Sequence, residues 1–202
     1  MEKVYKLKWD LDHSGDSEKD AFHFTFKNDI EFGADIISTR YFELPDEIYF
    51  QANFSIINEY DYLLNSLMAP VMSNRMLEII TCLGDTNIRV IPVIMISDLY
   101  PVKSIDVNRI KKSDNLVNFN FRIIQIMTYT DVFDYGNSEY DNDFILPVGN
   151  IHKLVLRKPL IGFPPIFRIK EKASEIFISQ ITKEALETAN IKGCIFEPVE
   201  TS

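Results

Sequence analysis

The densest group of side chains that could do chemistry lies in an acidic stretch of the second half of the chain. Its carboxylates and tyrosines are Asp131, Asp134, Tyr135, Glu139, Tyr140, Asp141 and Asp143. The last three carboxylates are spaced as in a calcium loop, but the glycine and the terminal glutamate of an EF-hand are absent. Three interpretations stay open: a solvated loop, a cation site, and an electrostatic surface for a basic protein on which the two tyrosines are aromatic anchors.

A second acidic stretch lies near the N-terminus and contains no aromatic residue. Its acidic residues are Asp10, Asp12, Asp16, Glu18 and Asp20. This composition predicts an exposed, solubilising loop. The segments 4–9 and 21–26 on either side of it alternate apolar and polar residues, so we predict that they are strands joined into a hairpin by this loop.

Catalytic and cofactor motifs are missing from the sequence. It contains no GxSxG, HExxH, GxGxxG or P-loop pattern, and His13, His23 and His152 lie in separate segments. Ser73 and Ser179 each precede a helical pattern and have no histidine nearby, so helix capping explains them better than nucleophilic catalysis. We therefore expect no catalytic residues, no cofactor and no metal site.

Two segments of the chain share one pattern and must position these side chains. Residues 71–93 and 177–199 align without a gap at a constant offset of 106. The alignment places Ser73 on Ser179 and Pro92 on Pro198, and it also matches apolar positions. Each segment predicts a strand, a serine-capped amphipathic helix and a second strand. The sequence thus suggests an internal duplication of a strand–helix–strand unit.

The remaining segments are mostly strands. Residues 60–67 have the spacing of a short helix, and residues 116–129 give the longest strand signal, with a change of phase near Ile123-Ile124 that predicts a bulge. Many strands with about three helices and no regular βαβ alternation indicate an α+β fold, with a mainly antiparallel or mixed sheet and a few short helices packed on it. We expect one domain over residues 1–202, with sub-halves at 1–100 and 116–202.

Charge and the two cysteines restrict the class of protein. The 202 residues include 30 acidic and 21 basic ones, for a net charge of −9. Such a chain is repelled by nucleic acid and suits a basic protein partner. Cys82 and Cys194 are far apart in apolar contexts, which predicts buried free thiols. With neither a secretion signal nor a membrane-spanning run in the sequence, we expect a cytoplasmic protein that binds neither membrane nor nucleic acid.

The C-terminal part of the chain carries a family resemblance. The residues that carry it are Phe167-Arg168-Ile169, Ile176–Ser179, Glu184-Ala185-Leu186, Gly193 and Phe196–Val199, preceded by Asp131–Asp134, Ser138–Tyr140 and Lys153–Leu156. From about Tyr129 to Val199 the sequence resembles immunity protein family eleven of polymorphic toxin systems, formerly a domain of unknown function. The motif consists of core and turn residues and contains no catalytic set. The position of Arg168 between two apolar residues is compatible with an ion pair inside the sheet and with exposure to solvent.

The resemblance implies an immunity protein that binds a cognate bacterial toxin and neutralises it by occluding its active site. A basic toxin would suit the acidic chain, and the acidic stretch with its two tyrosines would be the partner-binding surface. Two alternatives stay open. One is a hydrolase that reverses toxin damage with carboxylates of the acidic stretch, and the other is an adaptor domain without catalysis.

Overall fold

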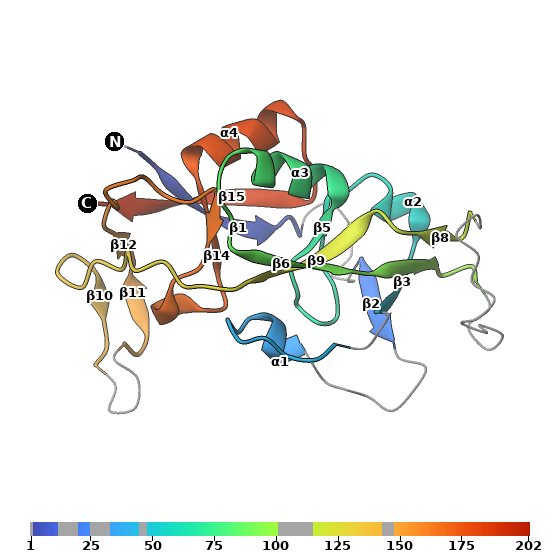
Figure 1. Cartoon of the computed structure of the whole chain (residues 1–202), viewed down its shortest axis with the longest axis horizontal. Coiled ribbons are helices and arrows are strands. Elements are labelled where there is room, and N and C mark those ends of the chain that lie inside the picture. Colours follow the sequence, from blue (N-terminus) through green and yellow to red (C-terminus); the bar gives the residue numbers. More distant parts are fainter. Residues whose placement is uncertain (1, 12–19, 25–32, 45–47, 101–114, 143–147) are drawn as a thin grey trace.

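The computed structural model describes residues 2–11, 20–24, 33–44, 48–100, 115–142 and 148–202. Within them the expected α+β class is confirmed, with short helices packed on antiparallel and mixed sheets (Figure 1). Asp143 and His13 lie outside the described residues, as do Asp12, Asp16 and Glu18 of the second acidic stretch.

The first unit of the fold is a sheet with the strand order β4-β5-β9-β6. Its elements are β4 (Tyr62–Leu63), β5 (Val71–Ser73), α3 (Asn74–Cys82), β6 (Ile88–Pro92) and β9 (Phe121–Ile126). The helix α3 connects β5 to β6, and β9 lies between these two strands, antiparallel to both.

The second unit is a sheet with the order β12-β15-β1-β14-β13. Its elements are β1 (Val4–Trp9), β12 (Val155–Leu156), β13 (Ile166–Phe167), the 3-10 turn η3 (Lys170–Lys172), β14 (Ile176–Ser179), α4 (Gln180–Thr188) and β15 (Cys194–Thr201). Here α4 connects β14 to β15, and β1 lies between them, antiparallel to both.

The two units have the same topology and register. The helices α3 and α4 each have nine residues and begin 106 positions apart, and β6 and β15 also begin 106 positions apart. In the first unit Ile88 pairs with Ile126 of β9. At the same register position of the second unit, Cys194 pairs with Trp9 of β1. The central strand therefore follows the first unit in sequence, whereas the second unit takes its central strand from the N-terminus.

The predicted hairpin of segments 4–9 and 21–26 is wrong. β2 (Ala21–Phe24) instead pairs with β3 (Tyr49–Ala52) in a third sheet, of order β2-β3-β7-β8. Its other strands are β7 (Ile94–Ser97) and β8 (Val117–Asn118). Alternation specifies a half-buried strand but not its partner, and the apolar face of β1 contributes Leu7 to the core between the two units.

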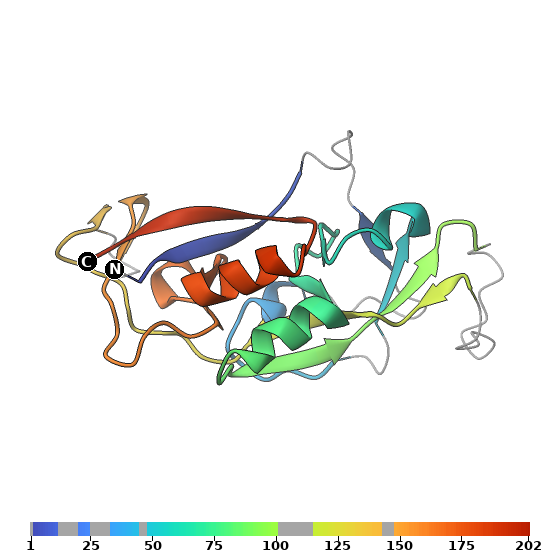
Figure 2. The ribbon, with the colours of Figure 1, turned by 90° about the horizontal axis from the view of Figure 1, so that it is seen from above.

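The helices begin at the two predicted caps. The Ser73 hydroxyl accepts a hydrogen bond from the backbone N–H of Met76 at 3.1 Å, and the Ser179 hydroxyl accepts one from Thr182 at 3.4 Å. These bonds satisfy N–H groups that have no partner inside the first turn. The helices α3 and α4 lie side by side in both views (Figures 1 and 2). The shorter helices are α1 (Gly33–Ile36) and α2 (Phe54–Ile57).

The buried apolar residues form three cores, one between the two units and one on the outer side of each unit. The middle core lies between the units and includes Leu7, Ile124 and Leu186. One outer core packs the first unit against the third sheet and includes Ile123. The other lies on the second unit and includes Phe133 and Phe177.

This arrangement explains why the predicted bulge near Ile123-Ile124 is wrong. β9 is buried on both faces, because Ile123 packs into one core and Ile124 into the next, so apolar residues occupy consecutive positions without any irregularity. The strand signal is instead interrupted at Phe119-Asn120, where the Asn120 N–H donates to the Asn118 side chain at 2.7 Å.

Two further expectations from the sequence need correction. The segment 60–67 contains β4 rather than a helix, because Tyr62 and Leu63 pair with β5. Cys82 is exposed at the end of α3, while Cys194 is half-buried; both are free thiols. Burial raises the pKa of the Cys194 thiol to about 12. Among the described helices, none has the length and apolar character needed to cross a membrane.

Candidate functional site

The predicted partner-binding residues lie at the outer end of the second unit. We call the described residues 131–142, together with the strand β11 (Ile151–Lys153), the acidic hairpin. Its two strands, β10 (Glu139–Tyr140) and β11, pair at the end of the molecule remote from α2 and near both chain termini (Figure 1). The Arg157 N–H donates to the Val132 carbonyl at 2.8 Å and joins the hairpin to β12.

An aromatic cluster supports the acidic hairpin. Buried Phe133 meets the edges of Tyr135 and Tyr140 at ring-centroid distances of 4.7 and 5.6 Å, and the two tyrosine rings are 6.0 Å apart. Tyr135 is 46% exposed, and its hydroxyl donates to Glu171 at 2.5 Å. That hydrogen bond is the main reason that the pKa of Tyr135 is raised to about 12. The two tyrosines predicted as anchors therefore contact each other, and both pack on Phe133.

The carboxylate of Asp134 is used within the chain. Its Oδ1 accepts from the N–H groups of Gly136 and Asn137 at 3.0 and 3.1 Å. Its Oδ2 accepts from the Asn137 amide at 2.8 Å and from the Ser202 hydroxyl at 2.6 Å. The Ser202 bond, followed by those from Asn137, lowers the pKa of Asp134 to about 2. Asp134 therefore builds the turn of the acidic hairpin and ties the C-terminus to it.

The other carboxylates of the acidic hairpin are exposed. Asp141 accepts from His152 at 3.0 Å, and this contact lowers the pKa of Asp141. Asp131 pairs with Arg157 at 3.1 Å and keeps 84% of its side-chain surface exposed. Glu139 is exposed on β10. Across the described residues, no group of three or more His, Cys, Asp or Glu side chains is close enough together to hold a metal ion.

The last residue of the second acidic stretch, Asp20, is buried. Asp20 is only 5% exposed, and its carboxylate accepts the N–H of Leu64 at 2.9 Å. The expectation of an exposed loop is therefore wrong for Asp20, whose carboxylate holds the start of β2 against the segment that follows β4. The reason is that a buried backbone N–H needs an acceptor, which composition alone does not reveal.

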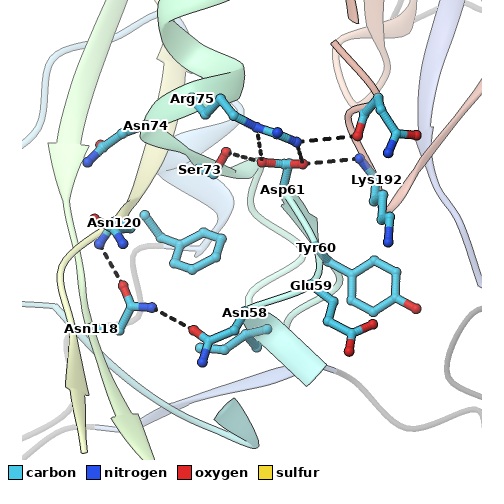
Figure 3. A pocket seen from close by; sticks show the side chains of 13 residues that line it. Asn58, Glu59, Tyr60, Asp61, Ser73, Asn74, Arg75, Asn118, Asn120 and Lys192 are labelled. Atoms are coloured by element: carbon cyan, nitrogen blue, oxygen red, sulfur yellow. Dashed lines mark hydrogen bonds and ion pairs between the residues drawn. The ribbon is translucent and has the colours of Figure 1, made fainter. Parts of the chain in front are cut away.

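Sequence reasoning missed a polar cleft of about 610 Å³ beside the start of α3. We call it the Asp61 cleft. It is lined by α2 and the segment after it, by the first residues of α3, by the segment before β9, and by the turn that follows α4 (Figure 3). Both units therefore contribute to its walls. No motif in the sequence marks it, because its residues come from four separate segments.

Asp61 is the best-connected side chain in this cleft (Figure 3). Its carboxylate accepts from the Ser73 hydroxyl at 2.6 Å, from Arg75 Nη2 at 2.7 Å and from the backbone N–H of Lys192 at 3.1 Å. Its backbone N–H also donates to the Lys192 carbonyl at 2.9 Å. Lys192 lies in the second unit and Ser73 in the first, so Asp61 links the two units.

The two units are also in close backbone contact at Gly193. Gly193 has a φ of +86°, and a Cβ at this position would lie 2.4 Å from the Tyr62 carbonyl oxygen. Only glycine fits there without a shift of the backbone. The turn after α4 and the strand β4 are therefore in direct contact.

Many of the side chains that line the Asp61 cleft are hydrogen-bonding groups. The Ser73 hydroxyl donates to Asp61 and accepts from Met76, so it is committed to structure. The remaining polar lining combines Glu59, Tyr60 and Lys192 with five asparagines: Asn58, Asn74, Asn118, Asn120 and Asn190. Amides of this kind bind backbone or polar side chains and supply neither a nucleophile nor a general base.

A comparison with protein families matches the part of the chain that carries the acidic hairpin. Residues 109–201 match the model of the Immunity protein family (Imm11). The match covers the acidic hairpin, β9 and the second unit apart from β1. It confirms the resemblance noted from Tyr129 to Val199, and it supports an immunity role for the protein. No curated protein matches the chain.

Proposed function

We propose that this protein is an immunity protein that binds a cognate bacterial toxin and blocks its active site. The observation that carries the proposal is the match of residues 109–201 to the Immunity protein family (Imm11). The proposed contact surface is the acidic hairpin, with Asp131, Asp134, Tyr135, Glu139, Tyr140 and Asp141 as partner-binding residues. Asp143, which follows in the sequence and lies outside the described residues, is proposed as a further one.

The geometry of the acidic hairpin supports a binding role. Exposed carboxylates surround two adjacent tyrosines, and interfaces between proteins often combine central aromatic anchors with a polar rim. Tyr135 and Tyr140 pack on Phe133, so little side-chain entropy would be lost on binding. The carboxylates would attract a basic toxin and speed its association, an effect that salt weakens.

Co-expression with the product of the neighbouring toxin-like gene tests the proposal. We expect rescue of growth and a complex that co-elutes in size-exclusion chromatography, more weakly at high salt. Rescue without a complex would contradict binding and favour an enzyme that reverses the damage. Absence of both rescue and complex would leave an adaptor domain.

A charge-matched pair of variants tests the surface. The triple variant Asp131→Asn, Glu139→Gln and Asp141→Asn removes three exposed charges from the acidic hairpin, and Tyr135→Ala removes an anchor. The control removes three exposed charges on and near the helices, by Glu78→Gln, Asp85→Asn and Glu184→Gln. We expect the triple variant to slow association and Tyr135→Ala to cost about 2 kcal/mol of binding free energy. Equal loss in the control would exclude the acidic hairpin as the contact surface.

A further inference from the structure

A small cavity of about 130 Å³ lies beside the first residue of β14, where the neighbouring strand β1 continues beyond it. β14 pairs with β1 only as far as Leu7, whereas β15 pairs with β1 to Trp9. The last two residues of β1 therefore face an open edge of the sheet. The exposed side chains of Met68 and Lys8 help to line the cavity, so it reaches the surface of the protein.

Two residues that line the cavity have buried N–H groups without hydrogen-bond partners. In the described part of the chain these groups are Trp9 Nε1 and Arg168 Nε, whereas the buried Glu175 Oε2 lies 3.3 Å from Lys6 Nζ in an ion pair. Each buried polar atom without a partner costs about 1–3 kcal/mol, so proteins rarely retain several of them in one place. Both groups are N–H donors, which calls for a ligand that accepts hydrogen bonds.

Two charged residues that line the cavity, Glu175 and Arg168, differ in whether a group of opposite charge lies beside them. Glu175 forms ion pairs with Lys6 at 3.3 Å and Lys172 at 3.9 Å. Arg168 is 1% exposed and donates one hydrogen bond, from Nη1 to the Ile37 carbonyl at 2.9 Å, but among the described residues it has no carboxylate partner. Burial lowers the pKa of the Arg168 guanidinium. An uncompensated buried cation beside unpaired donors favours an anion.

The loop at the mouth of the cavity is held in a strained conformation. Met68 has a φ of +53°, which is unfavourable for a residue with a side chain. The buried Asn65 side chain maintains this loop: its Nδ2 donates to the Leu63 and Ala69 carbonyls, and its Oδ1 accepts the N–H groups of Leu67 and Ala69. Strain that is maintained by such a network is typical of binding sites.

We propose that this cavity binds a compact oxyanion, a carboxylate or a phosphate, through Trp9 Nε1 and Arg168 Nε. The volume admits a group of a few heavy atoms and excludes a nucleotide. Lys6 and Lys8 add positive charge, although both are also paired with Glu197. Both donors come from the second unit, and no residue of the acidic hairpin lines the cavity, so the site is independent of the proposed toxin contact.

The protein carries its own reporter for this site. Trp9 is the single tryptophan of the chain, so its fluorescence reports on the cavity alone. Phosphate and acetate are titrated separately into the full chain, with sodium chloride used to hold the ionic strength constant. We expect a saturable change in emission and a higher unfolding temperature with one or both oxyanions, and the two titrations distinguish the sources. A response no larger than that to chloride would overturn the proposal.

Three variants test whether the response to the oxyanion arises at this cavity. Arg168→Gln removes the buried charge and should weaken binding by about ten- to a hundredfold, as expected for one charge-assisted hydrogen bond. Trp9→Phe removes the indole donor and is followed by the anion-dependent shift in unfolding temperature, which should shrink. Arg75→Gln removes an exposed cation of the Asp61 cleft and should bind as the parent does. If Arg168→Gln does not fold, an undiminished shift in Trp9→Phe still refutes the site.

Discussion

The two units share a topology and a register but differ in what covers the outer faces of their sheets. The third sheet covers the first unit, so β9 is buried on both faces. The outer core of the second unit covers Val4 but not Lys6, which pairs with Glu175 and Glu197. At one register position the first unit therefore has Ile123 and the second has Lys6. The comparison teaches that the neighbouring layer, rather than the unit itself, decides which residues a central strand carries.

The largest expected difference concerns these two equivalent positions. Ile123→Ala should lower the free energy of unfolding by about 2–5 kcal/mol, because it leaves a cavity between two layers. Lys6→Met should change it by about 1 kcal/mol or less, because the side chain keeps its apolar stem and loses only partly exposed ion pairs. Urea unfolding followed by circular dichroism measures both. Similar losses in the two variants would show that the outer faces are equally buried.

The two helix caps should differ by a smaller amount. Ser179→Ala removes a capping bond and should cost about 1 kcal/mol of stability. Ser73→Ala removes the equivalent bond and also the donor to the buried Asp61, so we expect about 2 kcal/mol. Thermal unfolding of both variants provides the measurement, and Ser174→Ala, at an exposed serine outside the helices, serves as the non-capping control. An equal cost for the two caps would mean that the link through Asp61 adds nothing to stability.

The smallest expected effect is a pH dependence confined to the second unit. The hydrogen bond from Lys8, followed by that from Lys6, lowers the pKa of Glu197 below its usual value of 4.5. A carboxyl whose pKa is lowered by folding stabilises the protein above its unfolded pKa, and this stabilisation is lost as the pH falls through the folded pKa. The position equivalent to Glu197 in the first unit is the apolar Ile91, which does not titrate.

Glu197→Gln should therefore flatten the loss of stability below pH 4.5. The change should be well under about 1 kcal/mol, because the side chain is 43% exposed and water screens the pair. Urea midpoints at several acidic pH values measure the change, with Glu78→Gln on α3 as the control. An unchanged pH profile would mean that the pairs of Glu197 do not persist in solution.

Much of the local structure could be predicted from the sequence. The pattern shared at an offset of 106 predicted a serine-capped helix followed by a strand in each segment, and Ser73 and Ser179 were correctly identified as caps. These features depend on interactions within a few residues, such as hydrogen bonds in the first turn and the apolar spacing of one helix face. The acidic residues and tyrosines of the acidic hairpin were likewise recognised as a group.

The partners of strands could not be predicted in this way. The period of β1 was correct, but its assignment to a hairpin was wrong, since its true neighbours β14 and β15 lie more than 160 residues away in sequence. The period of β9 was misinterpreted for a related reason. A strand between two cores has no polar face, and nothing within the strand itself says that a second layer will cover it.

The sequence by itself determined the α+β class, the repeated strand–helix–strand pattern with its caps, the net charge and the acidic, tyrosine-rich composition of the proposed contact surface. Only the tertiary structure decided that β1 completes the second unit, that Asp61 links the two units, and that Trp9, Arg168 and Glu175 meet at one cavity. The physical reason is that caps and periodicity are encoded locally. The burial and pairing of a polar side chain, in contrast, depend on groups that the folded chain brings from distant positions.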